Sequence, residues 1–301
     1  MKRMVVLLAA CALSACELEE AVVTSAQDVV IAAMYLRTDR PVQTALLHRT
    51  RQPGDSTKPV PGALIEVANQ AGNVLQLRAA PDSMCVLAHS VTSDIVIGTC
   101  YASDPQVRYD IVPGERYSLR IILPDGGELT ATTTVPQDFQ VTRPAASVCA
   151  LPAATRFEAQ WTQSPGAWVY AAETNMRGLR QLLAEQGVEL DRDPLRLFGL
   201  SVSSADTAIV FPSEFGLFDR FDDDLTEALA AIQGGLPSGV VADVVIAAAD
   251  RNYVNWERGG NFNPSGLVRI GSVRGDGFGV FGSLVVKSFQ IRVGSTEYPP
   301  C

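Results

Sequence analysis

The chain has 301 residues, of which 47% are hydrophobic and 19% are charged, and its formal net charge is −9 at pH 7. This composition is that of an ordinary globular protein with enough length for about two domains. The acidic balance and the lack of a Lys/Arg cluster argue against nucleic acid as a partner and against electrostatic binding to anionic lipid.

The N-terminus has the parts of a secretory signal peptide. Lys2 and Arg3 precede a short apolar run at residues 4–12, and residues 13–15 (Leu-Ser-Ala), of which the last two are small, then stand directly before Cys16. The run is shorter than the roughly 20 residues that a membrane-spanning helix needs. A cysteine at the cleavage point is typical of a bacterial lipoprotein, so we expect removal of residues 1–15 and acylation of Cys16 by palmitate-type chains. Cys11 is a second candidate, but it would leave a very short apolar core.

Residues 16–27 are expected to form a lipidated tether that attaches the fold to the membrane. The acidic residues Glu17, Glu19 and Glu20 resemble the export tags of surface-displayed lipoproteins in some Gram-negative phyla. A solvated linker explains them equally well. The tether therefore indicates membrane attachment and leaves the periplasmic or surface location open.

Four cysteines remain for the folded part of the chain, namely Cys85, Cys100, Cys149 and Cys301. An even number in an exported protein predicts two disulfides, with three possible connectivities. We favour Cys85–Cys100, which would close a loop between neighbouring strands, and Cys149–Cys301, which would tie the start of the C-terminal domain to the last residue. Zinc is disfavoured because no Cys/His pair has the short spacing of a metal site.

Residues 28–140 are expected to form a β-sandwich domain, because short strands follow one another at regular spacing. Turn residues at 69–73 and 124–127 predict two hairpins. The segments 61–63 (Pro-Gly-Ala) and 113–117 (Pro-Gly-Glu-Arg-Tyr) resemble the transthyretin-like, carboxypeptidase-regulatory class of sandwich. The strands are expected at residues 28–36, 41–48, 63–67, 74–77, 94–101, 107–112, 117–123 and 129–135.

Residues 145–301 are expected to form a larger β-rich domain with two or three short helices, so that the whole chain is mainly β. The helices are expected at residues 179–185, 225–232 and 250–257, the last of them capped by Asp250. The strands are expected at residues 156–161, 168–173, 195–202, 207–211, 240–248, 279–286 and 288–293.

Several motifs in order resemble an uncharacterised family of Gram-negative outer-membrane lipoproteins, known only as a domain of unknown function. They are a Gly-to-Pro strand pair at residues 114–136, the Tyr253 helix, Asn263-Pro264 and a glycine-aromatic strand at residues 275–282. Ser272 departs from an asparagine that is common in the family. The resemblance implies an outer-membrane location and an accessory role beside a TonB-dependent β-barrel receptor.

Two motifs that could indicate a ligand site are better explained by structural roles. The glycines at 275–279 are followed by a strand and not by the helix that a nucleotide site requires. The acidic cluster is a weak calcium candidate, but it lacks the EF-hand spacing, and acids also suit a helix N-terminus. Neither a cofactor nor a metal is therefore expected. The cluster comprises Asp219, Asp222, Asp223 and Asp224.

No nucleophile motif such as Gly-x-Ser-x-Gly occurs, and neither His48 nor His89 has an indicated partner. We therefore expect a non-enzymatic binding or accessory protein. The alternatives are a hydrolytic surface lipoprotein with a carboxylate-based site and a structural envelope protein. An aromatic sugar-binding surface is a further possibility, although core packing is favoured for most of its members. These are Trp161, Trp168, Tyr170 and Trp256.

Overall fold

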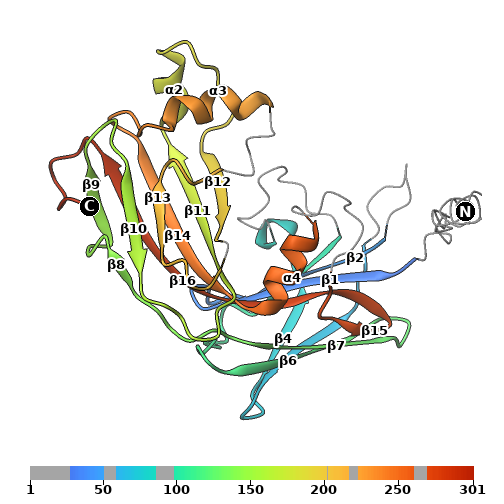
Figure 1. Ribbon diagram of the computed structural model, residues 1–301. Helices are drawn as coiled ribbons and strands as arrows, with labels where there is room; N and C mark the ends of the chain where they lie inside the picture. The colour runs from blue at the N-terminus through green and yellow to red at the C-terminus, as the bar shows by residue number, and fades with distance from the viewer. Residues whose placement is uncertain (1–27, 51–58, 86–97, 202, 217–222, 261–269) are drawn as a thin grey trace, which may run out of the picture.

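The computed structural model describes residues 28–50, 59–85, 98–201, 203–216, 223–260 and 270–301, and β-strands dominate it (Figure 1). The mainly β fold class predicted from the sequence is confirmed. The strands before residue 140 are β1 Val30–Arg37, β2 Thr44–Arg49, β3 Leu64–Asn69, β4 Val74–Ala79, β5 Thr99–Ser103, β6 Arg116–Ile122 and β7 Glu128–Thr134.

The later part of the chain adds further strands and three α-helices within the described ranges, matching the expected two or three. The helices are α2 Leu179–Ala184, α3 Asp223–Ile232 and α4 Arg251–Gly260. In the earlier part of the chain, a short 3-10 helix, η1, covers Asp82–Met84. The strands are β8 Val141–Arg143, β9 Val148–Leu151, β10 Phe157–Trp161, β11 Val169–Arg177, β12 Leu195–Leu200, β13 Ala208–Phe211, β14 Val241–Ala249, β15 Arg274–Gly275 and β16 Gly277–Val293.

Most strands belong to one large mixed sheet, whose order is β12-β11-β14-β16-β1-β2-β5-β4-β3-β6-β7-β15. Strand β9 pairs with β16 beside this path, and β13, β10 and β8 form a separate small sheet. Both predicted hairpins, β3–β4 and β6–β7, are present as antiparallel pairs. The strongest turn signals in the sequence therefore lie where the chain reverses.

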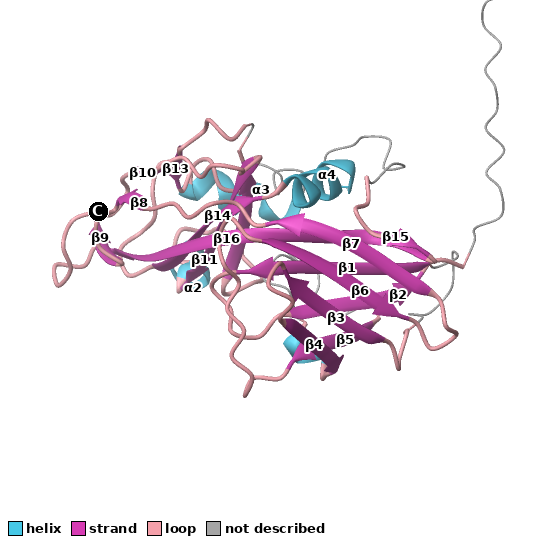
Figure 2. Ribbon diagram, turned by 90° about the horizontal axis from the view of Figure 1, so that it is seen from below, coloured by secondary structure: helices cyan, strands magenta, loops and turns pink. Residues whose placement is uncertain are grey.

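Strand β16 is 17 residues long and runs from the strands of the N-terminal segment to those of the C-terminal segment (Figures 1 and 2). Its first half pairs in parallel with β1, from Gly277 opposite Val30 onward, and its second half pairs antiparallel with β14. Two separate closing strands were expected here, but Lys287 and Ser288 continue the ladder with β14 without a break. The boundary between segments 28–140 and 145–301 stays a prediction. Strand β16 belongs to the second segment and pairs with β1 of the first, so the two segments are hydrogen-bonded to each other.

Alternating hydrophobic residues place the core on one face of the strands. In β6 the buried positions are Tyr117, Leu119 and Ile121, whereas the residues between them are exposed or half-buried, as the two-residue period of a strand requires. The main hydrophobic cluster takes residues from both sequence segments, for example Leu119 and Val285. Burial therefore links the two segments in addition to the hydrogen bonds along β16.

Residues 107–112, expected to be a strand, are irregular. Val107 is 51% exposed and Val112 is 48% exposed, and the Val112 N–H donates to the Tyr117 hydroxyl at 2.9 Å. The segment bonds locally to a side chain, and apolar residues alone do not make a strand without a ladder partner.

Helix α4 lies against the sheet where β1, β11, β14 and β16 come together (Figure 1). Tyr253 and Val254 on this helix pack into a second hydrophobic cluster with Val169, Ala247 and Leu284 from the strands below. None of the helices in the described ranges is long and apolar enough to cross a membrane. The polar groups discussed next lie beside this second cluster.

Candidate functional site

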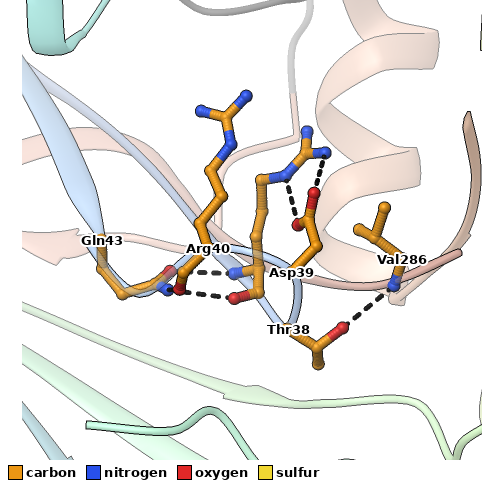
Figure 3. A network of polar contacts seen from close by, with 6 residues as sticks. Thr38, Asp39, Arg40, Gln43 and Val286 are labelled. Carbon is orange, nitrogen blue, oxygen red and sulfur yellow. Dashed lines mark hydrogen bonds and ion pairs between the residues drawn. The ribbon is translucent and has the colours of Figure 1, made fainter. Parts of the chain in front are cut away.

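The turn between β1 and β2 is held by the side chain of Gln43, which is only 1% exposed. Its Oε1 accepts the Arg37 N–H at 2.9 Å, and its Nε2 donates to the carbonyls of Arg37 at 3.0 Å and Arg40 at 2.7 Å (Figure 3). The amide therefore satisfies backbone groups that the turn would otherwise bury unpaired. This clamp defines the backbone course at both arginines.

The same turn is also fastened to β16. The Thr38 N–H donates to the Leu284 carbonyl at 3.2 Å, and the Thr38 hydroxyl accepts the Val286 N–H at 3.0 Å (Figure 3). On the other side, Gln43 and Ser103 exchange hydrogen bonds at 3.0 Å in both directions. Hydrogen bonds to β1, β5 and β16 therefore hold the backbone of the turn in a fixed position.

Arg37 and Asp39 form a two-bond ion pair within this turn. The Arg37 Nε and Nη2 atoms donate to the two carboxylate oxygens of Asp39 at 3.0 Å and 3.1 Å. The Arg37 side chain is 7% exposed and that of Asp39 is 35% exposed. This fork-to-fork geometry is the strong form of an arginine–carboxylate contact, and it engages both oxygens of Asp39.

Arg40 has a different environment. It is half-buried, and its guanidinium points away from Asp39 and Gln43 (Figure 3). Burial, followed by the neighbouring Arg37 charge, lowers the pKa of Arg40, whereas Asp39 and Glu173 act in the opposite direction. In the described part of the chain its guanidinium has no ion pair within 4 Å and no hydrogen bond. An arginine nevertheless keeps its charge in proteins.

A small recess opens beside the two arginines. It is lined by Tyr35, Arg37, Arg40, Gln43, Thr44 and Cys85, among others, and its cavity volume is about 20 Å³. A space of this size holds about one water-sized group. The recess therefore suits the end of a polar group and not an entire sugar or nucleotide.

Two tyrosines adjoin the recess and connect it to α4. The rings of Tyr35 and Tyr253 meet edge to face at 5.2 Å, and the Tyr35 hydroxyl donates to Glu257 Oε1 at 3.1 Å. Burial, and then the carboxylates of Glu257 and Glu173, raise the pKa of Tyr253 well above its ordinary value. The Tyr253 phenol is therefore a neutral hydrogen-bond donor near neutral pH and not a base.

Asp250, predicted to cap α4, occupies that position. It is 5% exposed, and its Oδ1 accepts the N–H of Tyr253 at 2.9 Å, as a helix cap does. Its Oδ2 accepts the Thr133 hydroxyl at 2.6 Å. Burial raises the pKa of Asp250. Both of its oxygens accept structural hydrogen bonds, so this carboxylate connects β7 to α4.

A wider groove lies beside the end of β5, along the part of β4 at residues 74–76 that pairs with β3 but, among the described residues, not with β5. Its cavity volume is about 450 Å³. Three of its lining residues are exposed apolar side chains, namely Val74 at 50%, Met84 at 36% and Val107 at 51%. Exposed apolar residues gathered at one groove are characteristic of a contact surface.

The predicted cysteine pairs are confirmed. Cys85 is joined to Cys100 and Cys149 to Cys301, with Cα–Cα distances of 5.7 Å and 5.0 Å. Cys16, the predicted lipidation site, lies outside the described residues. The structure therefore bears out the two disulfides, and the anchor itself stays a prediction.

The acidic cluster is only partly within the described ranges. Asp219 and Asp222 lie outside them, whereas Asp223 and Asp224 are the first residues of α3. No group of three or more potential metal ligands occurs among the residues that the structure describes. Of the two histidines, His48 has its Nδ1 atom 3.1 Å from the Arg49 carbonyl, and His89 is outside the described part.

Three of the four aromatic residues considered for sugar binding are buried. Trp161, Tyr170 and Trp256 are 5%, 1% and 7% exposed, which confirms core packing for most of them. Trp168 is 49% exposed, and the Arg251 guanidinium stacks on its ring at 5.0 Å. The four residues therefore form no common surface.

The glycine-aromatic motif is part of β16. Gly279 lies opposite Ala32 of β1 with a φ of +145°, and a Cβ at this position would overlap the Ala32 backbone. The hydroxyl of Ser272, the residue predicted to depart from the asparagine of the lipoprotein family that the sequence resembles, accepts the Phe281 N–H at 2.8 Å. These residues are used for strand packing, as expected for the glycines.

The recess residues Tyr35, Arg37, Arg40 and Gln43 were not singled out from the sequence. The charged run at residues 37–40 before Pro41 signals a turn between two strands. That signal does not indicate that Gln43 folds back onto it or that α4 lies beside it, since the second contact involves residues more than 200 positions away.

Comparisons with known proteins are sparse for this chain. No known family profile and no curated protein matches it. Among solved structures, fibronectin(III)-like modules of Clostridium thermocellum CbhA align with 89% of this chain and 94% of their own, at 9% identity and a TM-score of 0.19.

Proposed function

We propose that this chain is a membrane-anchored, non-enzymatic binding lipoprotein that works beside a TonB-dependent receptor in the outer membrane. The lipoprotein signal before Cys16 is the observation that carries the anchoring. The two disulfides support it, because such bonds form and persist in oxidising compartments. The order of motifs that resembles outer-membrane lipoproteins supports the accessory role.

Two surface features support a binding role. The groove beside β4 exposes Val74, Met84 and Val107 to solvent, and apolar surface of this kind is used for partner contacts. The turn between β1 and β2 presents the half-buried Arg40 from a backbone that Gln43 and Thr38 hold in place. Pre-organised side chains lose little freedom when they bind a partner.

Membrane fractionation tests the anchor. The variant Cys16→Ala should move from the membrane fraction to the soluble fraction, because it removes the acylated thiol. Cys11→Ala is the matched control, since it changes the other cysteine of the signal segment and should leave the protein on the membrane. Full membrane retention of Cys16→Ala would contradict the proposal.

Cross-linking in intact cells tests the partner. Mass spectrometry of the cross-linked material should identify a TonB-dependent β-barrel receptor, and the substitution Met84→Asp in the β4 groove should reduce the yield. Arg108→Gln is a surface control, because Arg108 is 88% exposed, forms an ion pair with the nearby Asp110 and does not line the groove. Repeated recovery of no receptor from intact cells would refute the accessory role.

A further inference from the structure

On the basis of the proposed binding function, we infer that the recess beside Arg37 and Arg40 binds a carboxylate group of the ligand, with Arg40 as its principal contact. The recess lies between the β1–β2 turn and Cys85. A carboxylate is planar and accepts two parallel hydrogen bonds from a guanidinium.

The strongest reason is the isolation of Arg40. A half-buried charge is costly unless an opposite charge or hydrogen-bond acceptors compensate it. Across the described ranges of the chain, the Arg40 guanidinium has no ion pair within 4 Å and no hydrogen bond; Asp39 and Glu173 act on it electrostatically without such contact, and Arg37 is a neighbouring positive charge. A second positive charge nearby increases the cost, so the missing partner is an anion.

Nearby carboxylates do not supply this partner. Asp39 follows Arg37 in the same turn, but both of its oxygens accept hydrogen bonds from the Arg37 guanidinium. Glu173 on β11 influences Arg40 electrostatically, yet it forms no ion pair with it within the described residues. The acceptor positions around Arg40 are therefore open to a group from outside.

The support of the site is rigid. Gln43 holds the backbone carbonyl of Arg40 at 2.7 Å, and Thr38 bonds to β16 at both its N–H and its hydroxyl. Binding sites gain affinity when their groups are already in place. Arg40 is thus a charged side chain whose backbone cannot relax away from its unfavourable position.

The size of the recess selects the ligand group. The volume of about 20 Å³ suits a single water-sized polar atom, such as one oxygen of a carboxylate. The Tyr35 hydroxyl is already engaged with Glu257 and so helps to form the wall of the recess. The carboxylate can come from a small organic acid or from a glutamate side chain on a peptide, and the two sources are distinguished below.

The test is a backbone-amide NMR titration of the purified full-length protein at constant ionic strength. The probes are sodium acetate and the peptide acetyl-Gly-Glu-Gly-amide, with acetyl-Gly-Gln-Gly-amide as the neutral comparison. Saturable shifts at residues 38–43 are expected with a carboxylate probe only. Tighter binding of acetate indicates a small acid as the source, and equal or tighter binding of the glutamate peptide indicates a polypeptide.

The variant Arg40→Gln should bind the carboxylate probe about tenfold more weakly, the ratio expected when a charge-assisted hydrogen bond is lost. Arg108→Gln carries the same charge change on a remote exposed arginine and should bind like the wild type. Unsaturable shifts, or equal binding by Arg40→Gln and the wild type, would overturn the inference. None of these results depends on Cys16, so the anchor is judged separately.

Thermal unfolding provides the second readout. Without a carboxylate probe, Arg40→Gln should unfold at the wild-type temperature or above it, because the change removes an uncompensated charge and no hydrogen bond of the side chain. Residues placed for binding commonly reduce stability in this way. A clear fall in the unfolding temperature would assign Arg40 a structural role and overturn the inference.

Discussion

The Thr133 hydroxyl donates a 2.6 Å hydrogen bond to Asp250 Oδ2 and thereby joins β7 to the first turn of α4. Both residues are buried, at 3% and 5% exposure. The Ser283 hydroxyl of β16 lies 2.8 Å from the same Thr133 oxygen. Strands β7 and β16 and the start of α4 therefore meet at the Thr133 hydroxyl, which helps to hold α4 in place.

Substitution of Asp250 by alanine should lower the free energy of unfolding by about 2–4 kcal/mol. The helix cap accounts for about 1 kcal/mol, and the buried donors left without an acceptor account for the remainder. Asp110→Ala is the control, because Asp110 is 66% exposed and a surface change should stay within about 0.5 kcal/mol. Urea unfolding measures both. Equal effects of the two variants would refute the role of Asp250.

Stability should also depend on pH through Asp250. Burial raises its pKa above the ordinary value of 3.8, so the folded protein holds this proton more tightly than the unfolded chain does. The resulting stabilisation is fully present below pH 3.8 and is lost as the pH rises through the folded-state pKa. The difference in unfolding free energy between wild type and Asp250→Asn should therefore decrease from about pH 3 to about pH 7. A constant difference would contradict this.

Local signals in the sequence predicted much of the fold. The hairpin loops at residues 69–73 and 124–127 were recognisable because glycine and asparagine are favoured in tight turns. Asp250 was recognisable as a cap because it directly precedes a helical segment. The cysteine count left three connectivities, and the favoured one is present. These features depend on residues near one another in the sequence or on simple pairing rules.

The missed features depend on contacts between distant residues. Strand β16 is continuous because β14 supplies partners for Lys287 and Ser288, whereas residues 107–112, which mix apolar and charged side chains, have no ladder partner among the described residues. The recess required knowledge that Gln43 bonds backward to the turn and that Tyr253 lies against Tyr35. Hydrophobic period and turn chemistry contain no information about such pairings.

The clamp at the β1–β2 turn can be tested by Gln43→Met, which keeps the side-chain length and removes its three hydrogen bonds. The expected loss of unfolding free energy is about 3 kcal/mol, or about 1 kcal/mol for each bond. Gln76→Met is the matched control, because Gln76 is exposed on β4 and its side chain makes one hydrogen bond, to Glu66, among the described residues. Chemical denaturation compares the two. A loss at Gln43 no larger than at Gln76 would show that the clamp contributes little.

Close packing of β1 against β16 predicts a severe effect of Gly279→Ala. The φ of Gly279 is +145°, and an added Cβ would overlap the backbone of Ala32, which has no room to move within a paired strand. The expected loss is at least about 3 kcal/mol, from backbone strain and the steric overlap together.

The control Gly72→Ala separates the effect of backbone strain from that of steric overlap. Gly72 has a φ of +83° but nothing within 4 Å of an added Cβ, so strain alone should cost about 1 kcal/mol. Thermal and urea unfolding of both variants measure the contrast, and similar losses would show that the β1–β16 approach is looser than the contact with Ala32 requires.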